Sequence, residues 1–265
     1  MKSEILFDNG RHKWVVFGRD PERKKEVIDT NQYVIIHDEQ AILLDPGGIE
    51  IFPQVITELS KYVKTENIKA ILSSHQDPDI SSSLSMWFDM CSELKVYCSW
   101  LWTGFLSHFG MGTSLKLMPI PDDGMELNIG TTNSAVYFVP AHYCHSSGNF
   151  ICFDPITNFL FTGDLGAALL PDDETDMFVK NFESHIKYME LFHKRWLPSN
   201  NAKNILIKKI REINPDMLCP QHGSIFKGAD TVRFLDWLEN LDVGNLVFEN
   251  EGSDYSNAPW MKWKK

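Results

Sequence analysis

The stretch Ala70-Ile71-Leu72-Ser73-Ser74-His75-Gln76-Asp77-Pro78-Asp79 passes from an apolar segment directly into a cluster of polar side chains. Five consecutive positions hold one imidazole and two carboxylates. In a strand, His75, Asp77 and Asp79 would lie on one face but spread along it at about 3.3 Å per residue, so they converge only if the chain turns out of the strand through them. Pro78 favours that turn because it discourages continued regular structure. These residue types at this spacing predict a metal site, with an ordinary polar loop as the alternative.

Three later segments repeat the arrangement of a short apolar run followed by a potential ligand. His142 follows Val136-Tyr137-Phe138-Val139, Asp164 follows Phe159-Leu160-Phe161, and His222 follows Met217-Leu218-Cys219. Layered α/β folds place functional residues in this way, at the carboxyl ends of buried strands. Either histidine alone would be interpreted as a core or surface residue. Together with His75 and Asp164 they predict one shared site.

Composition and charge limit the function classes of the chain. A length of 265 residues and a hydrophobic content of 43% are sufficient for a substantial core. The formal charge of −11 would repel a phosphate backbone, so nucleic acid is not an expected partner. Arg23-Lys24-Lys25 and Lys208-Lys209 are interpreted as solvated loop and helix faces. No apolar stretch approaches the roughly twenty residues that span a bilayer, and no signal-peptide core follows Met1, so no membrane contact is expected.

The cysteines Cys91, Cys98, Cys144, Cys152 and Cys219 form no C-x-x-C pair. Their odd number argues against a disulfide framework and favours a reducing, cytoplasmic location. Cys144 and Cys219 lie near predicted ligands in the sequence. Either could supply a thiolate to a metal, but buried free thiols are the plainer interpretation.

Apolar periodicity divides the chain into alternating strands and helices. Strands are expected at 14–17, 33–36 and 41–44, with a tight turn at Asp38-Glu39-Gln40. The apolar residues between Val55 and Val63 predict a helix before the strand that leads to His75. Further strands are expected near 95–98, 135–139, 150–153, 159–162 and 217–219, and further helices near 82–93, 182–196, 203–213 and 230–241.

Two β-rich halves with helices between them predict an α/β fold of the αββα type. In this architecture, helices cover the outer faces of a two-sheet sandwich. A single domain is expected over residues 1–265. The segment 100–118 is rich in tryptophan, phenylalanine and methionine, and we expect it either to cover the site as an apolar lid or to pack in the core.

The order H-x-D-x-D, H, D, H at strand ends resembles the metallo-β-lactamase fold, and in detail its diiron branch, the flavodiiron proteins. The resemblance covers nearly the entire chain. Zinc hydrolases of that fold carry H-x-H-x-D-H, whereas flavodiiron proteins have a carboxylate at the third position, where this chain has Asp77. The resemblance implies a first metal on His75, Asp77 and His142, a second on Asp79 and His222, and a bridge by Asp164, because a carboxylate offers two oxygens to two cations.

One position departs from the family pattern. Where flavodiiron proteins have a further histidine for the second metal, this chain has Ile80, which cannot bind a cation. With Asp164 counted at both ions, the first metal keeps four protein ligands and the second keeps three. The second ion would then either leave positions free for water or dioxygen or bind weakly.

A second stretch, His142-Tyr143-Cys144-His145-Ser146-Ser147-Gly148-Asn149, is similar to the H-x-x-H-S-P-G-N stretch of oxygen-binding diiron proteins, with Ser147 in place of proline. Those relatives of flavodiiron proteins lack the flavodoxin module, and some act in oxygen sensing. This chain ends soon after the His222 region without a glycine-rich flavin phosphate loop, so no bound flavin is expected. His145 is expected either to donate a hydrogen bond to a bound oxygen species or to serve a structural role.

The resemblance implies a non-haem diiron protein that binds dioxygen at a carboxylate-bridged site. It would act as an oxygen sensor or carrier or, with an external electron donor, as an oxygen or nitric oxide reductase. The alternative is a dinuclear zinc hydrolase of esters, thioesters or lactones, although Asp77 and Ile80 count against it. Zinc or manganese also suits such ligands. A degenerate fold that serves only as an interaction or signalling module is the third hypothesis, against which the retained ligands speak.

Two further features bear on the site and its partners. Asp45 resembles an aspartate that supports a histidine ligand from behind in this fold, with a turn-capping role as the alternative. The tail Pro259-Trp260-Met261-Lys262-Trp263 is expected to pack on the domain or on a second subunit. Flavodiiron relatives usually dimerise, so a homodimer is expected, together with a separate electron donor or signalling partner.

Overall fold

The computed structural model describes residues 1–18, 20, 26–109, 116–130, 134–244 and 259. The expectations for the basic stretch 23–25 and for tail residues 260–263 lie outside the described residues, so the predicted extent of the single domain also stays a prediction. Within the described ranges, no helix is long and apolar enough to cross a membrane.

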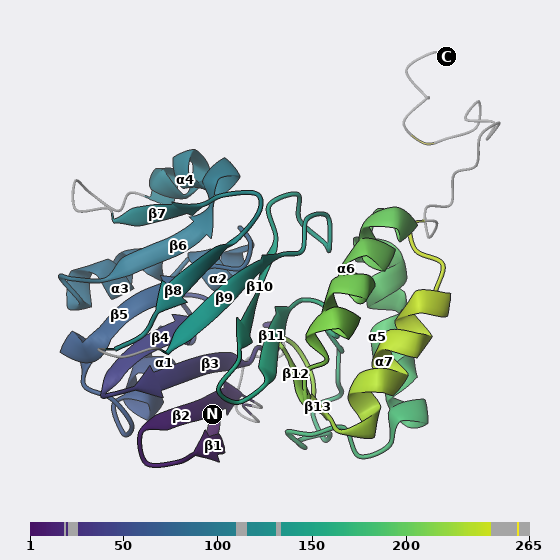
Figure 1. Ribbon diagram of the computed structural model, residues 1–265, viewed down its shortest axis with the longest axis horizontal. Coiled ribbons are helices and arrows are strands. Elements are labelled where there is room, and N and C mark those ends of the chain that lie inside the picture. Colours follow the sequence, from purple (N-terminus) through teal and green to yellow (C-terminus); the bar gives the residue numbers. More distant parts are fainter. Residues whose placement is uncertain (19, 21–25, 110–115, 131–133, 245–258, 260–265) are drawn as a thin grey trace.

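Two β-sheets lie face to face, with helices on the outer faces (Figure 1). The first sheet consists, in spatial order, of β1 (Lys2–Asp8), β2 (His12–Gly18), β3 (Gln32–His37), β4 (Gln40–Leu44), β5 (Ile68–Leu72), β6 (Lys95–Ser99) and β7 (Leu117–Ile120). The second consists of β13 (Phe226–Lys227), β12 (Met217–Pro220), β11 (Phe159–Gly163), β10 (Phe150–Asp154), β9 (Ala135–Pro140) and β8 (Met125–Asn128).

The helices divide between the two sheets. Helices α1 (Phe52–Leu59), α3 (Leu84–Met90) and α4 (Trp100–Leu106) pack on the first sheet, and α5 (Phe182–Trp196), α6 (Asn200–Ile213) and α7 (Ala229–Asn240) pack on the second. The short helix α2 (Pro78–Ser81) directly follows the predicted ligand cluster, and two 3-10 turns occur at η1 (Thr65–Asn67) and η2 (Ser107–Phe109).

Strand periodicity explains the layers. Along β2, Trp14 faces the core between the two sheets, while its neighbour Val15 faces the helices on the outside. In the second sheet, Phe161 lies in the core between the sheets and Leu160 packs against the outer helices. Since both faces of the central strands are covered, apolar residues are required at consecutive positions. The αββα architecture expected from the sequence is confirmed.

The predicted ligands follow strands that end at the same edge of the sandwich. Strands β4, β5 and β6 are parallel, and so are β11 and β12. His75 follows β5, Asp164 follows β11 and His222 follows β12. The backbone N–H of Gln221 donates to the carbonyl of Gly163 at 2.8 Å, which holds the ends of β11 and β12 together.

Most expected elements appear within one or a few residues of their predicted bounds, and the differences have local causes. Helix α6 begins earlier than expected because the Ser199 hydroxyl accepts a hydrogen bond from the N–H of Ala202 and caps it. The turn at Asp38-Glu39 is confirmed, with both residues at positive φ. Strand β1 was missed because it is an edge strand with several exposed positions.

Candidate metal centre

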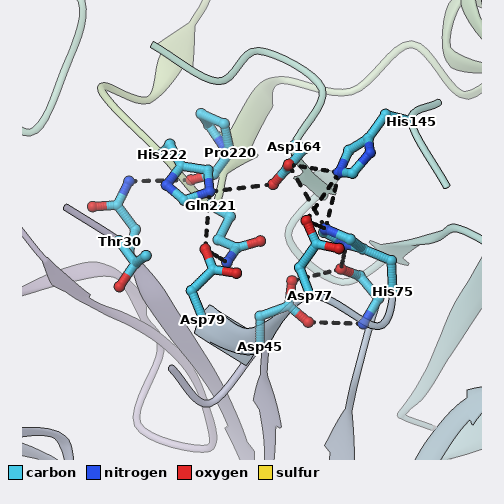
Figure 2. Close-up of polar contacts among 12 residues, drawn as sticks. Thr30, Asp45, His75, Asp77, Asp79, His145, Asp164, Pro220, Gln221 and His222 are labelled. Atoms are coloured by element: carbon cyan, nitrogen blue, oxygen red, sulfur yellow. Dashed lines mark hydrogen bonds and ion pairs between the residues drawn. The ribbon is translucent and has the colours of Figure 1, made fainter. Parts of the chain in front are cut away.

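Four potential metal ligands converge at the edge where the strands end. One nitrogen or oxygen atom from each of His75, Asp77, His145 and Asp164 lies within 4.8 Å of all the others (Figure 2). The Nε2 atoms of His75 and His145 are 3.2 Å apart, and both lie 3.5 Å from Oδ2 of Asp77. Two imidazole nitrogens and a carboxylate thus face one point, as a shared cation requires.

A second group lies on the other side of Asp164. Nε2 of His222 lies 3.3 Å from Oδ2 of Asp79 and 3.4 Å from Oδ1 of Asp164. The other oxygen of Asp164, Oδ2, lies 3.0 Å from Nε2 of His145. The two oxygens of one carboxylate therefore face two separate groups of donors, which is the arrangement of a bridging ligand.

Opposite charges compensate each other within the cluster. Burial alone would raise the pKa of Asp164, but the imidazoles of His75 and His222 outweigh it and hold that pKa well below its usual range. Burial alone would lower the pKa of His145, but Asp164 and Asp77 raise it to about 9. The same balance raises the pKa of His222 well above its ordinary value. In the metal-free protein, protonated imidazoles thus stabilise the carboxylates. A bound cation would take over this role and displace the protons from the imidazoles.

Asp45 supports His75 through a serine. The carboxylate of Asp45 accepts from the backbone N–H of Ser74 at 2.8 Å and from its hydroxyl at 2.6 Å. The Ser74 hydroxyl oxygen in turn lies 2.8 Å from Nδ1 of His75. Because that hydroxyl proton goes to Asp45, the oxygen accepts the Nδ1–H of His75, which leaves the Nε2 lone pair directed into the centre. Asp45 acts from behind the ligand, as the resemblance implies.

The structure corrects one predicted ligand. Nε2 of His142 donates to the backbone carbonyl of Asp122 at 2.8 Å, and its ring packs edge-on against Phe150 with centroids 5.3 Å apart. His142 is therefore turned away from the group, and His145 takes the place expected for it. His145 was expected only to act on a bound oxygen species or on structure.

A tight loop explains this exchange. Ala141 donates through its N–H to the carbonyl of Asn149 at 2.9 Å, and Tyr143 donates to Ser146 at 2.7 Å. The loop folds back on itself, so its middle, and not its first polar residue, reaches the centre. The N–H of Phe150 donates to the carbonyl of Ser74 at 3.0 Å, which fixes the loop beside His75. In the sequence, only the pairing of two histidines in the H-x-x-H stretch indicated that His145 could replace His142 in the donor group.

The centre opens into a cavity of about 500 Å³. Its apolar lining comes from Val27, Ile28, Leu169, Phe192 and Trp196. The rings of Trp196 and Phe192 meet the ring of His145 edge-on, with centroids 5.4 and 6.5 Å away. A ligand approaching the proposed ions therefore passes apolar side chains.

The expected lid at 100–118 does not supply this lining. Its residues 110–115 lie outside the described ranges, and none of its described residues lines the cavity. Leu106 is buried in the core with Trp102 packed against it, so part of the segment has the core role. Trp100 and Phe105 are exposed on α4.

Among the described residues, neither Cys144 nor Cys219 belongs to the group of converging donors. Burial raises the pKa of Cys144 to about 12 and that of Cys219 well above its ordinary value. Both thiols are therefore protonated at neutral pH. The plainer interpretation, buried free thiols, agrees with this result.

Two glutamines hold the aspartates, and the sequence analysis missed both. Nε2 of Gln76 donates to Oδ1 of Asp77 at 3.1 Å, and Nε2 of Gln221 donates to Oδ2 of Asp79 at 3.0 Å. The Ser146 hydroxyl donates to Oε1 of Gln76 at 2.6 Å. Each glutamine is the sequence neighbour of a predicted ligand, which is the signal that could have identified it.

The donor set fits a pair of divalent transition metals. Imidazole nitrogens and carboxylate oxygens are mixed at both groups, as iron, manganese and zinc accept. Oδ1 of Asp164 is buried and has no hydrogen-bond partner among the residues described. A buried carboxylate oxygen needs a positive charge beside it. In the metal-free protein the imidazole of His222, 3.4 Å away, supplies that charge, and a bound cation would replace its proton.

Comparisons with known proteins find relatives in sequence and in fold. Residues 28–223 match the model of a family described as "ODP family beta lactamase". Two structures of the chemotaxis sensor ODP, described as a peroxy diiron species and as the apo state from T. denticola, are each 34% identical to this chain. Their TM-scores are 0.81 and 0.79, and the matches cover 92% of this chain and 97% and 96% of theirs.

More distant relatives share the fold. A mutant of the flavo di-iron protein from Thermotoga maritima is 22% identical, with a TM-score of 0.74, over 90% of this chain and 60% of its own. The uncharacterized protein MJ0732 of Methanocaldococcus jannaschii is 22% identical over 199 residues. That match covers 74% of this chain but only 49% of the relative, so this chain spans about half of that protein's length.

Proposed function

The chain belongs to the ODP family of β-lactamase-like proteins, and on that premise we propose that it is a non-haem diiron protein that binds dioxygen. One observation carries the proposal: the two oxygens of Asp164 face two separate groups of imidazole and carboxylate donors. The matched chemotaxis sensor, described as a peroxy diiron species, supports iron and dioxygen as the occupants.

Each donor has a role in this proposal. His75, Asp77, His145 and Asp164 hold the first ion, and Asp79, Asp164 and His222 hold the second. A ferrous pair, when bound, supplies the electrons that dioxygen accepts on binding. The negative charge of the three aspartates would offset part of the positive charge of two bound cations.

The walls of the cavity select the ligand. Leu169, Phe192 and Trp196 present apolar surface beside the donors, which favours a small uncharged molecule over an anion. Trp196 and Phe192 also cover the ring of His145 and limit its contact with water. These rings therefore restrict the access of water and protons to the donors.

Whether the protein acts as a sensor or carrier or as a reductase depends on the presence of a separate electron donor. Without electrons from a separate donor, the centre binds dioxygen and the protein acts as a sensor or carrier read by a signalling partner. With such a donor, it would reduce oxygen or nitric oxide. We further propose a homodimer and a cytoplasmic location, the latter supported by five buried free thiols that suit a reducing compartment.

Metal analysis followed by exposure to air tests the proposal. Protein produced with iron and purified without oxygen should contain nearly two irons per chain, and admitting air should produce a coloured species in the visible absorption spectrum. The same protein loaded with zinc should remain colourless in air. Abundant zinc with ester or thioester turnover, and no spectral response of the iron form to air, would instead support the hydrolase alternative.

A further inference from the structure

The side chain of Gln221 enters the candidate metal centre from a rigid backbone. Gln221 directly follows β12 and is 1% exposed. Its N–H donates to the carbonyl of Gly163, and its carbonyl accepts from the N–H of Asn31. The backbone is thus held on both sides, so the position of the amide group is set by the fold.

Only one end of this amide has a partner. Nε2 donates to Oδ2 of Asp79 at 3.0 Å, whereas Oε1 is buried and has no hydrogen-bond partner among the described residues. Figure 2 shows the amide of Gln221 beside Asp79, among the carboxylates and imidazoles. A buried amide oxygen is almost always satisfied in a folded protein, because leaving it bare costs free energy. This oxygen is therefore available to a group that occupies the centre.

The other glutamine of the centre provides the contrast. Gln76 also donates to an aspartate, Asp77, but its Oε1 accepts a hydrogen bond from the hydroxyl of Ser146 at 2.6 Å. Both ends of the Gln76 amide are satisfied by protein atoms. Gln76 therefore needs no further partner to position Asp77, whereas the amide oxygen of Gln221 still lacks a partner.

The second metal group is also the one that lacks a ligand. Ile80 stands where the resembling family has a histidine, and it is fully buried with no donor atom. The imidazole of His222 and the amide of Gln221 both reach Oδ2 of Asp79, at 3.3 and 3.0 Å. The unpartnered oxygen and the missing ligand therefore occur in the same group.

We propose that the carboxamide oxygen of Gln221 is the fourth protein ligand of the second metal. It would take the place of the histidine that the resembling family has at the position of Ile80. The proposal rests on the two-metal centre described above. An amide oxygen is a neutral, hard donor, which suits a ferrous or manganous ion. It completes the donor set without adding negative charge beside Asp79 and Asp164.

Two substitutions separate a ligand from a mere hydrogen-bond donor. Gln221→Leu removes both amide atoms, and Gln221→Glu keeps an oxygen but loses the N–H that holds Asp79. Full-length proteins loaded anaerobically with ferrous iron would be titrated with a chelator, and iron per chain and iron coordination number by X-ray absorption would be measured. Gln40→Leu, on strand β4 away from the donors, is the matched control.

The expected result is a selective loss. Gln221→Leu should lower the affinity for the second ion by at least about tenfold. One iron per chain would then be retained, with a lower mean coordination number. Gln221→Glu and the control should keep two irons. Circular dichroism and the unfolding temperature of the metal-free proteins would verify that each variant folds.

Three outcomes would overturn the assignment. The first is an unchanged iron affinity in Gln221→Leu. The second is an equal loss of iron affinity in Gln221→Glu and Gln221→Leu. The third is a wild-type protein that holds a single ion. Dioxygen enters none of these measurements. If the wild type holds two irons but does not respond to air, the proposed function fails while the role of Gln221 stands.

Discussion

Asp164 is the residue on which both metal groups depend. Its Oδ2 lies 3.0 Å from His145 and 3.7 Å from His75, and its Oδ1 lies 3.4 Å from His222. It is nearly fully buried at the end of β11, where the parallel neighbour β12 delivers His222. Every other candidate donor faces only one of the two groups.

Removing this carboxylate should empty both positions. Asp164→Ala is expected to reduce iron from nearly two per chain to nearly none, because each ion loses a ligand and three imidazoles lose their countercharge. Asp79→Ala should remove only the second ion. Elemental analysis after anaerobic loading measures both, and an Asp164→Ala protein with its full iron content would show that the bridge is misplaced.

The two histidines of the H-x-x-H stretch should behave differently. His145→Ala is expected to lower the affinity of the first ion by at least about tenfold, because it removes a ligand. His142→Ala should leave the affinity unchanged, since that ring bonds to the carbonyl of Asp122. Competition titration with a chelator compares them, and the opposite ranking would restore His142 as the ligand.

Metal affinity should rise with pH. The pKa of His145 is raised to about 9, so in the metal-free protein its ring is protonated at pH 7, and an ion must displace that proton to bind. Below pH 9 each unit of acidification therefore lowers the apparent affinity about tenfold for each proton displaced. Zinc titrations between pH 6.5 and 9 measure the slope, and a flat profile would contradict it.

Among the elements, helix α5 links the centre to the outer surface. The Asn181 side chain caps its first turn by accepting from the N–H of Ser184 at 3.0 Å. Near its other end, Phe192 and Trp196 touch the ring of His145. Nε2 of His193 accepts from the N–H of Gly166 at 3.0 Å, in the turn that follows Asp164. One helix thus contacts two of the segments that carry donors.

His193 should make the metal-free protein sensitive to acid. Burial lowers its pKa to about 4, below the ordinary 6.5 of the unfolded chain, so the unfolded state binds the extra proton between these values. Stability is therefore lost as pH falls from 6.5 to 4, by at most about 3 kcal/mol. Urea unfolding of wild type and His193→Gln at pH 7 and 5 isolates this contribution, which should be absent in the variant.

At the scale of the whole molecule, a core of buried apolar side chains joins the two sheets. Phe161 on β11 is fully buried and its ring lies 5.5 Å from that of Tyr33 on β3, so it joins the two sheets. Phe161→Ala should destabilise the protein by about 3–5 kcal/mol through lost burial and a cavity. Urea unfolding measures the loss, and Phe105→Ala, on an exposed residue of α4, should change stability little.

The layered fold could be predicted because the pattern of apolar residues along a strand indicates which of its two faces are covered by other elements. Residues 159–161 and 217–219 are apolar at consecutive positions, and both strands are buried on two faces. The predicted ligands Asp164 and His222, which directly follow straight strands, were identified for the same reason. His145 was expected only in a supporting role, because hydrogen bonds within the 141–149 loop, which periodicity does not report, decide the direction of its side chain.

The cavity wall could not be predicted for a related reason. Trp196 and Leu169 come from segments far from the first ligands in the sequence, and only the packing of α5 brings them there. The segment 100–118 had a suitable composition, but composition carries no information about position. Gln221 was not singled out from the sequence, because a glutamine has no characteristic spacing relative to metal ligands.

The candidate donors come from both layers of the sandwich. His75, Asp77 and Asp79 follow a strand of the first sheet, and His145, Asp164 and His222 follow strands of the second. With cations in place, the centre would join the two sheets at this rim, in addition to polar contacts elsewhere between them, such as those of Asp154 with His12 and Trp14. Loading the ions would therefore stabilise the packing of the two sheets against each other.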